Sequence, residues 1–438
     1  MDVSELPEHA TLSNYEALAE DFVNAYNAND PEALRRIALH YALDRLPTVG
    51  QLRMNVADRL RRLGKVSSIG SPNEELSLSD ARALVADSYG FENWRALSEF
   101  LDAINTDSPI SRFETAVDAV VAGDTATLER LLHAHPELIR ARSAREHGAT
   151  LLHYVAANGV EDFRQKTPNN AVEIARILLD AGAEVDADLA YGLSPSLRAR
   201  YPGRVGSTTL GLTATSIHPV HAGVQIALME TLLDAGAALD GLQDGWGFVN
   251  GCLANGRPEA AHFLAERGAR LDLESAAGLG RLDLVQGFLN NDGGFKATAT
   301  RAQMESGFMW ACEYGHNPVI EFLLDKRLEV SAQVAGMTGL HWALVGGRLE
   351  TIKLLVERKA SLEARNSYGG TALGCATWAV RNSDPAYRWP DSDTDWVTIV
   401  QTLIDAGARV NEFDVDFPTG NEAVDELLLR HGMKPSTQ

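Results

Sequence analysis

Apolar residues in the stretch 337–366 recur at helical spacing in two short runs. Leu340 and Ala343 belong to the first run, and Ile352 and Leu355 give the second run an apolar face. Each predicted helix is only about three turns long, and helices of that length are marginal in isolation. The pattern therefore predicts a helix–turn–helix unit whose apolar faces must be covered by neighbouring units.

A five-residue phrase that begins with a small or basic residue and has Val or Leu at its fourth position recurs along the chain. It reads GAEVD, GAALD, GARLD, RLEVS, KASLE and GARVN, beginning at Gly182, Gly236, Gly268, Arg327, Lys359 and Gly407. Successive starts lie 54, 32, 59, 32 and 48 residues apart. A repeat of about 33 residues explains these gaps if the 59 contains one degenerate copy and the 54 and 48 contain insertions.

The openings of three copies identify the type of repeat. Residues 150–155, 338–343 and 371–376 read TLLHYV, TGLHWA and TALGCA. They resemble the T-P-L-H-x-A opening of the ankyrin repeat, although the Pro is absent and the His remains only as His153 and His341. The resemblance implies an all-α solenoid of helix–turn–helix repeats with short hairpin loops. It also implies that both histidines are structural and tie one repeat's loop to the next.

The predicted array covers residues 113–433, with about eight repeats and a carboxy-terminal cap. Insertions are predicted at 160–170, 188–207 and 381–395. A helical amino-terminal region at 1–66, in which degenerate helical pairs are one interpretation, a linker at 67–75 and a helical pair at 76–106 precede the array. The pair carries a Y-G-F-x-x-W phrase, with Phe91 and Trp94 as packing anchors. It is similar to segments that precede ankyrin arrays in many soil bacteria, which implies a bacterial protein.

Composition narrows the range of functions. The 438 residues are 45% hydrophobic and 23% charged, as in ordinary soluble proteins, and no apolar run approaches the roughly 20 residues of a membrane span. The acidic amino terminus lacks the features of a secretory signal, so we expect a cytoplasmic protein without a membrane partner. The net charge of −21 argues against nucleic acid, because phosphate contacts need clustered Lys and Arg. The basic run from Arg45 to Lys65 is interpreted as a solvated helix face, with a nucleic-acid arm as the weaker alternative.

Candidate chemistry is sparse. Cys252, Cys312 and Cys375 cannot all pair and lack metal-like spacing, so we expect buried reduced thiols. His218 and His221 do not share one helix face, and no metal or cofactor is expected. Phosphate-loop and nucleophile motifs are absent from the sequence, so we expect no enzyme.

An ankyrin-like stack exposes a concave groove built from its first helices and hairpin tips. The candidate groove residues are Asn158, Trp246, Asn255, Trp310, Glu313, Tyr314, Trp342, Tyr368 and Trp378. Exposed aromatic side chains are frequent anchors of recognition, because they bury a large area and lose few rotamers. For Trp310 and Trp342, packing on the next helix pair is an equally weighted alternative. We expect a monomeric protein-interaction scaffold that binds an unidentified protein partner in this groove.

The predicted insertions supply a second set of candidates. These residues are Tyr191, Arg198, Arg200 and Arg204 in one loop, and Tyr387, Arg388 and Trp389 in another. Long loops with aromatic and Arg residues are often functional, here toward an anionic partner, but the same loops could simply cover the groove. The alternative function is a small-molecule-binding protein or enzyme whose pocket lies between groove and loops. It predicts converging polar groups with displaced pKa values.

Overall fold

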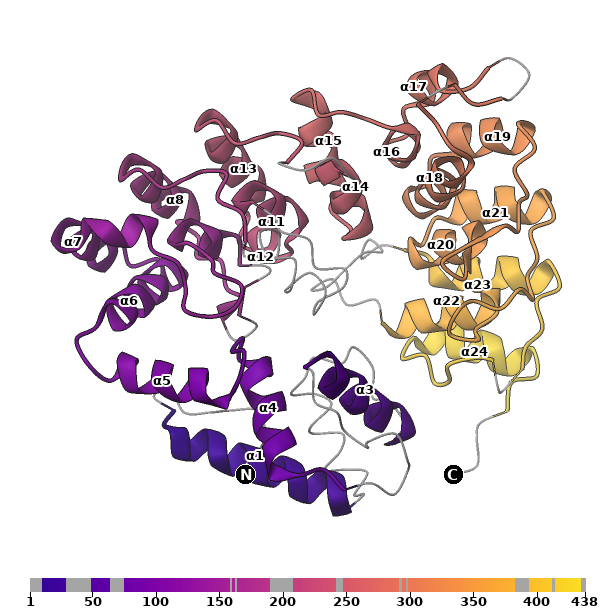
Figure 1. The fold of residues 1–438 in the computed structure, drawn as a ribbon. Coiled ribbons are helices and arrows are strands. Elements are labelled where there is room, and N and C mark those ends of the chain that lie inside the picture. The colour runs from indigo at the N-terminus through magenta and orange to yellow at the C-terminus, as the bar shows by residue number, and fades with distance from the viewer. Residues whose placement is uncertain are drawn as a thin grey trace. The chain divides into compact units, whose positions relative to one another are not determined.

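A computed structural model of the chain describes most of its length (Figure 1). The described residues are 10–28, 49–63, 75–157, 160–161, 164–189, 208–241, 247–290, 294–296, 298–382, 394–411 and 414–434. The chain divides into two compact units, Met1–Ala238 and Leu239–Gln438, and each is treated by itself below. This division falls inside the array predicted from the repeat spacing, and the spacing gives no indication of it.

The first unit begins with helices that precede the repeats. They are α1 (Leu12–Ala28), α3 (Val49–Arg62), α4 (Leu78–Ser88) and α5 (Trp94–Ile104). Helix α1 packs on α4, and Phe22, Tyr26 and Leu84 are buried in their shared cluster. The side chains of Ser77 and Asn93 accept backbone N–H bonds at the starts of α4 and α5, which is the usual role of these residue types at an N-cap.

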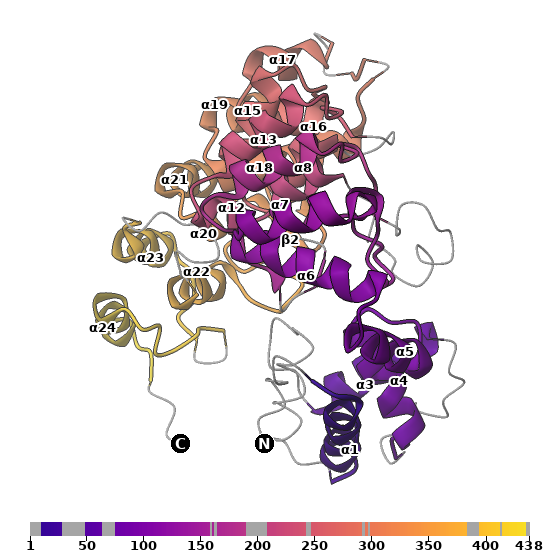
Figure 2. The same cartoon turned by 90° about the vertical axis from the view of Figure 1, so that its left-hand side faces the viewer.

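Three helix pairs follow in the first unit. Their elements are α6 (Pro109–Ala122), α7 (Thr125–Ala134), the 3-10 helices η1 (Pro136–Arg140) and η2 (Leu151–Ala156), α8 (Ala171–Asp180), α11 (Thr209–Thr215), α12 (His218–His221) and α13 (Gln225–Asp234). The first elements of the pairs contact one another in the order α6, η2, α11. The second elements contact one another in the order α7, α8, α13 (Figure 2). Each pair therefore covers an apolar face of its neighbour, as a repeat stack requires.

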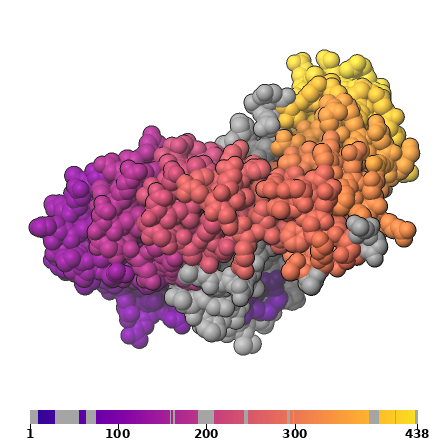
Figure 3. Space-filling model, turned by 90° about the horizontal axis from the view of Figure 1, so that it is seen from above, coloured from indigo at the N-terminus to yellow at the C-terminus, as the bar shows by residue number. Residues whose placement is uncertain are grey.

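The second unit continues with five pairs and a last helix. Its helices are α14 (Gly247–Ala254), α15 (Pro258–Glu266), α16 (Leu273–Gly278), α17 (Leu282–Gly287), α18 (Arg301–Tyr314), α19 (Asn317–Asp325), α20 (Gly339–Val345), α21 (Leu349–Glu357), α22 (Ala372–Arg381), α23 (Trp396–Asp405) and α24 (Glu422–Arg430). Helices α14, α16, α18, α20 and α22, here called the inner helices, contact one another in that order, while α17, α19, α21 and α23 form a second row, called the outer helices, and α24 packs on α23. As a space-filling surface the pairs follow one another in chain order from orange to yellow (Figure 3).

The short pair α16–α17 accounts for the 59-residue gap between two of the repeated phrases. Each of its helices has six residues, and the pair lies between the phrases that begin at Gly268 and Arg327. The predicted degenerate copy is therefore confirmed. The one two-stranded ladder among the described residues, β1 (Gln333–Val334) and β2 (Met337–Thr338), forms a hairpin between α19 and α20.

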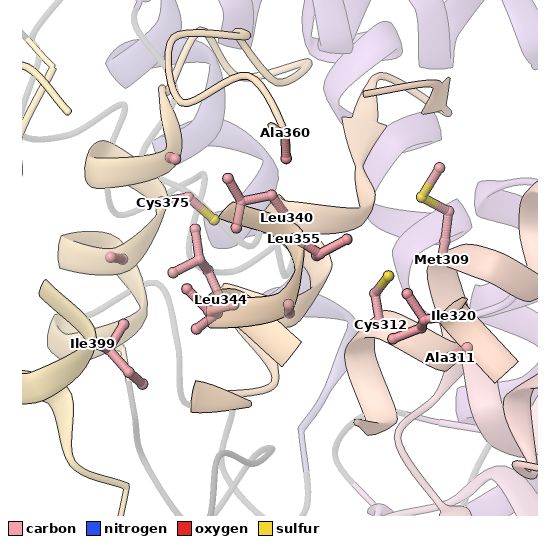
Figure 4. Close-up of a cluster of buried hydrophobic side chains, with 14 of the residues drawn as sticks. Met309, Ala311, Cys312, Ile320, Leu340, Leu344, Leu355, Ala360, Cys375 and Ile399 are labelled. Atoms are coloured by element: carbon pink, nitrogen blue, oxygen red, sulfur yellow. The ribbon is translucent and has the colours of Figure 1, made fainter. Parts of the chain in front are cut away.

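The core of the second unit runs from repeat to repeat as one apolar row. Figure 4 shows Cys312, Leu340, Leu344 and Cys375 within it, each contributed by an inner helix. All three cysteines are buried thiols outside any disulfide, and burial raises the pKa of Cys252 and Cys375 to about 12. The expectation of buried reduced thiols is confirmed for the fold described here.

The repeated phrase follows the second helix of six pairs, namely α8, α13, α15, α19, α21 and α23. The residues that begin it have positive φ: Gly182 (94°), Gly236 (92°), Gly268 (95°), Arg327 (67°), Lys359 (65°) and Gly407 (98°). In one example, the N–H of Lys359 donates to Val356 O at 3.0 Å and that of Ala360 to Leu355 O at 2.9 Å. This is a Schellman ending, in which a left-handed residue lets the chain satisfy the last carbonyls of the helix.

The fold class predicted from the sequence is confirmed: the protein is a helical repeat stack preceded by a helical amino-terminal region. Within the described ranges, none of the helices is both long and apolar enough to span a membrane.

Candidate functional site

Two tryptophans of the candidate groove set lie on adjacent inner helices and contact each other. Trp310 on α18 and Trp342 on α20 have ring centroids 6.0 Å apart and planes inclined by 47°. Both side chains are half-buried, and Trp342 packs against the apolar core. Part of each ring therefore packs between repeats, and part of it remains accessible. Both alternatives from the sequence, packing and exposure in the groove, apply in part to each ring.

The position of Trp310 is fixed by the preceding inner helix. Its Nε1–H donates to Glu274 Oε1 on α16 at 2.9 Å, and Glu274 is only 7% exposed. A Cβ on Gly278 would lie 2.6 Å from Leu253 Cδ1 and 3.0 Å from Trp310 Cβ. The glycine is needed at this close approach, so the indole has little room to move.

The end of α18 is tied back to earlier repeats. The Tyr314 hydroxyl donates to Leu253 O, and the ring of Tyr314 lies 6.4 Å from that of His316. His316 Nε2 lies 3.0 Å from Gly278 O. Burial lowers the pKa of His316 to about 4, so the ring is neutral near pH 7 and its Nε2–H donates to that carbonyl. The Tyr314 hydroxyl is therefore hydrogen-bonded within the repeat array.

Glu313 was expected to face the groove, but its side chain lies in the interior. Its side chain is fully buried, and its backbone oxygen accepts a hydrogen bond from Arg348 Nε at 3.1 Å. A Cβ on Gly346 would sit 2.1 Å from that same oxygen, so α18 and α20 approach closely here. Repeat alignment places Glu313 at an outward position, but in the structure its side chain is buried.

The remaining described groove candidates differ in their solvent exposure. Trp378 is half-buried and packs against the apolar core, while Asn255 is exposed and its Nδ2 donates to Gly251 O at 2.8 Å. Tyr368 has 69% of its surface exposed. It is the most exposed large aromatic side chain in the described part of the chain.

Tyr368 stands at the tip of a well-braced turn. Asn366 Oδ1 accepts from the N–H of Tyr368 at 3.0 Å and from that of Gly370 at 2.9 Å. Gly369 has a φ of +84°, which suits glycine, and the Ser367 N–H donates to Gly336 O of the preceding hairpin at 2.8 Å. The backbone that carries the exposed phenol is held before any partner arrives.

Several predicted residues lie outside the described residues. They are Asn158 and Trp246 of the groove set, and Tyr191, Arg198, Arg200, Arg204, Tyr387, Arg388 and Trp389 of the insertion loops. Their roles remain predictions from the sequence.

The two motif histidines have the structural surroundings expected of them. The N–H of Thr338 donates to His341 Nδ1 at 3.2 Å, and the corresponding bond from Thr150 to His153 Nδ1 is 3.0 Å. Burial lowers the pKa of His341, opposed by the carbonyl groups of Gly370 and Ala364 in the next repeat. The ring thus braces the start of its own helix.

Sequence reasoning missed a buried charged cluster in the first unit. It consists of Glu114, Arg145, His147, Tyr154, Glu161 and Arg164, with the exposed Asp118 at its edge. Its members lie up to 50 residues apart, so no local pattern connects them. The one signal in the sequence is Glu114, which occupies an otherwise apolar face of its helix. Elsewhere in the described ranges, no group of three or more His, Cys, Asp or Glu side chains is arranged to hold a metal ion.

The stacked pairs, their left-handed helix ends and their hairpin tips define a helical-repeat protein. Part of the second unit matches ankyrin repeats: a family profile described as ankyrin repeats (3 copies) matches residues 273–366 and 308–388. The capping Thr338–His341 arrangement lies within these residues.

Known proteins with similar sequences share only parts of the chain. Inversin of Gallus gallus is 37% identical over 62 residues, which are 14% of this chain and 6% of inversin. The ankyrin repeat domain-containing protein SAT10 of Stachybotrys chartarum is 28% identical over 160 residues, 36% of this chain and 7% of that protein. This chain therefore spans less than a tenth of either relative. The crystal structure of the human ASB11 ankyrin repeat domain matches 66% of this chain and 100% of that chain, with 19% identity and a TM-score of 0.31.

Proposed function

We propose that the chain is a protein-interaction scaffold that binds its partner through the inner helices and hairpin tips of the second unit. Ankyrin repeats are generally protein-interaction modules, which gives the class of function. The observation that carries the proposal is Tyr368, an exposed phenol on a turn that is already braced. A tyrosine of this kind adds a large contact area at a small entropic cost.

The half-buried indoles of Trp310 and Trp342 are proposed as the second contact. Their packing keeps them in place, and fixed side chains lose less freedom on binding than flexible ones. Trp378 and Asn255 are proposed to lie at the edge of the same contact. Glu313 is left out because its side chain is buried.

The net charge of −21 favours a partner with a cationic or mixed surface. Association with such a partner is steered by charge, so it should slow as salt is raised. We propose that the chain acts as a cytoplasmic monomer and does not bind nucleic acid.

The pocket alternative is not preferred. It calls for converging polar groups with displaced pKa values, and two such groups are used within the fold. His316 donates to Gly278 O, and Glu161, whose pKa is lowered to about 2, accepts from Tyr154 and His147.

The test compares the unmodified full chain with Tyr368→Ala and Tyr368→Phe. Partners are first captured on the immobilised chain and identified, and the dissociation constant of a purified partner is then measured for each variant. We expect Tyr368→Ala to weaken binding about tenfold or more, as removal of an aromatic hot spot does, and Tyr368→Phe to weaken it less.

Leu429 on α24 provides a matched control, since it is also exposed, at 43%, but belongs to the last helix and not to an inner helix or hairpin. Leu429→Ala should leave the dissociation constant unchanged. Binding that is insensitive to Tyr368→Ala and Trp342→Ala but weakened by Leu429→Ala would refute the proposed face. Thermal unfolding of each variant separates lost binding from lost structure.

A further inference from the structure

The charged cluster of the first unit is built around two buried carboxylates. Both oxygens of Glu114 on α6 accept from Arg145 Nη1 at 3.0 Å, and Glu114 Oε2 also accepts from Arg164 Nη1 at 2.6 Å. Glu161 Oε1 accepts from the Tyr154 hydroxyl at 2.8 Å and lies 3.3 Å from Arg145 Nη1. Arg145 therefore contacts the carboxylates of two different segments.

A histidine completes the contacts of Glu161. His147 Nδ1 accepts the Ala149 N–H at 3.0 Å, so its other nitrogen carries the proton. That Nε2–H donates to Glu161 Oε1 at 3.0 Å. These bonds and the two arginines hold the carboxylate ionised, which is why the pKa of Glu161 lies well below its usual range despite burial.

The opposite side of Arg145 faces the helical pair that precedes the repeats. Its guanidinium carbon lies 4.6 Å from the ring centroid of Phe100 and 5.4 Å from that of Phe91, and those rings are themselves 4.9 Å apart. The N–H of the next residue, Glu146, donates to Gly90 O at 2.8 Å. Cation–π contacts of this kind gain strength when the cation is desolvated, and the Arg145 side chain is only 6% exposed.

We infer that Arg145 locks the helical pair α4–α5 onto the first two repeats, so that these segments open and close as one cooperative unit. The guanidinium lies between two aromatic rings of the pair and carboxylates from α6 and the 160–170 segment. Removing one partner of such a buried arrangement leaves other charges uncompensated, which is far more costly than losing a surface ion pair. Loss of any one partner is therefore expected to open the whole contact.

The predicted insertion at 160–170 gains a role from this inference. Its described residues Glu161 and Arg164 turn inward, and Arg164 also joins Glu114 to Asp118 through Nη2 at 2.8 Å. Three carboxylates thus face two guanidinium groups and the His147 donor. Through these contacts the segment acts as a clamp on the fold.

Native-state hydrogen exchange on the unmodified full chain tests this inference directly. Amide exchange is followed at increasing denaturant for α5, α6 and α8, and the opening free energy of each helix is compared. We expect the three helices to reach a common opening curve. An α5 that opens separately and at lower free energy than α6 would overturn the inference.

A conservative variant gives the second readout. Arg145→Lys keeps the charge but removes the planar group that stacks on the rings and contacts both carboxylates. We expect exchange in α5 and α6 to accelerate together by about tenfold or more, because hydrogen bonds to charged groups contribute that much.

The control for that variant is Arg140→Lys, which changes an exposed arginine on η1. It should leave both helices unaffected. Acceleration confined to α5 or to α6, or equal effects of the two lysine variants, would contradict the lock. If Arg145→Lys fails to fold, the exchange curves of the unmodified chain still decide the question.

Discussion

Lys359 is the first residue of one of the six repeated phrases, and in four of those phrases the first residue is glycine. Its φ is 65°, in the left-handed region, while the glycines at equivalent positions have φ of 92° to 98°. The side chain is exposed, and the helix end is held by the backbone bonds of Lys359 and Ala360. Replacing the lysine by glycine should keep these bonds and remove only the strain of the Cβ.

The expected gain follows from two opposing terms. A left-handed conformation costs an L-residue roughly 1–2 kcal/mol, whereas a glycine adds about 0.5–1 kcal/mol of conformational entropy to the unfolded chain. Lys359→Gly should therefore stabilise the local structure by about 0.5–1 kcal/mol. The reverse change, Gly407→Lys, should destabilise by a similar amount, because a Cβ there would meet nothing within 4 Å and only backbone strain changes.

Hydrogen exchange of the outer helices is the suitable assay, since repeats contact only their neighbours and the effect should be local. Amides of α21 should exchange roughly two- to fivefold more slowly in Lys359→Gly, and those of α23 faster by the same factor in Gly407→Lys. Faster exchange of α21 in Lys359→Gly, or no response to Gly407→Lys, would show that the left-handed strain does not control these helix ends.

Three further predictions concern the inner helices. Gly346→Ala should destabilise the second unit by about 2–4 kcal/mol in urea unfolding, because its Cβ would collide with the backbone oxygen of Glu313. A change below about 0.5 kcal/mol would mean that α18 and α20 move apart easily. Tyr314→Phe should cost about 0.5–1.5 kcal/mol through loss of the bond to Leu253, with no gain in exposure of the ring, and an unchanged denaturation midpoint would speak against that bond. His316 has a folded pKa of about 4, below its unfolded value of 6.5, so the unfolded state binds more protons between these values. Stability should be full above pH 6.5 and fall by up to about 3 kcal/mol as the pH drops to 4, and His316→Gln should remove that part of the pH dependence.

Much of the fold was accessible from sequence because the repeat leaves a local trace. The recurring phrase reports a helix end, and the same left-handed turn occurs at Gly182 and at Lys359 although the residue types differ. Its spacing also revealed the short pair α16–α17, whose own helices are too short to show clear periodicity. Periodicity works here because each repeat's contacts are with its immediate neighbours.

The site was less predictable because it depends on distances between helices. Glu313 has the repeat position of an outward residue, yet its side chain is buried where α18 and the end of α20 come close together. Arg145 and Glu161 belong to segments that a repeat alignment treats as loop and insertion, so nothing local predicts that they pair. The exposure of Tyr368 was anticipated because the tip of a hairpin projects in any copy.

The paired indoles of Trp310 and Trp342 give the molecule an optical property of its own. Two such chromophores at 6.0 Å, with a fixed inclination of 47°, share their excited states, and the circular dichroism of the pair depends on both values. Since the rings come from consecutive repeats, any separation of those repeats alters the signal. The circular dichroism of this tryptophan pair therefore reports, without any added label, whether these two repeats stay packed together.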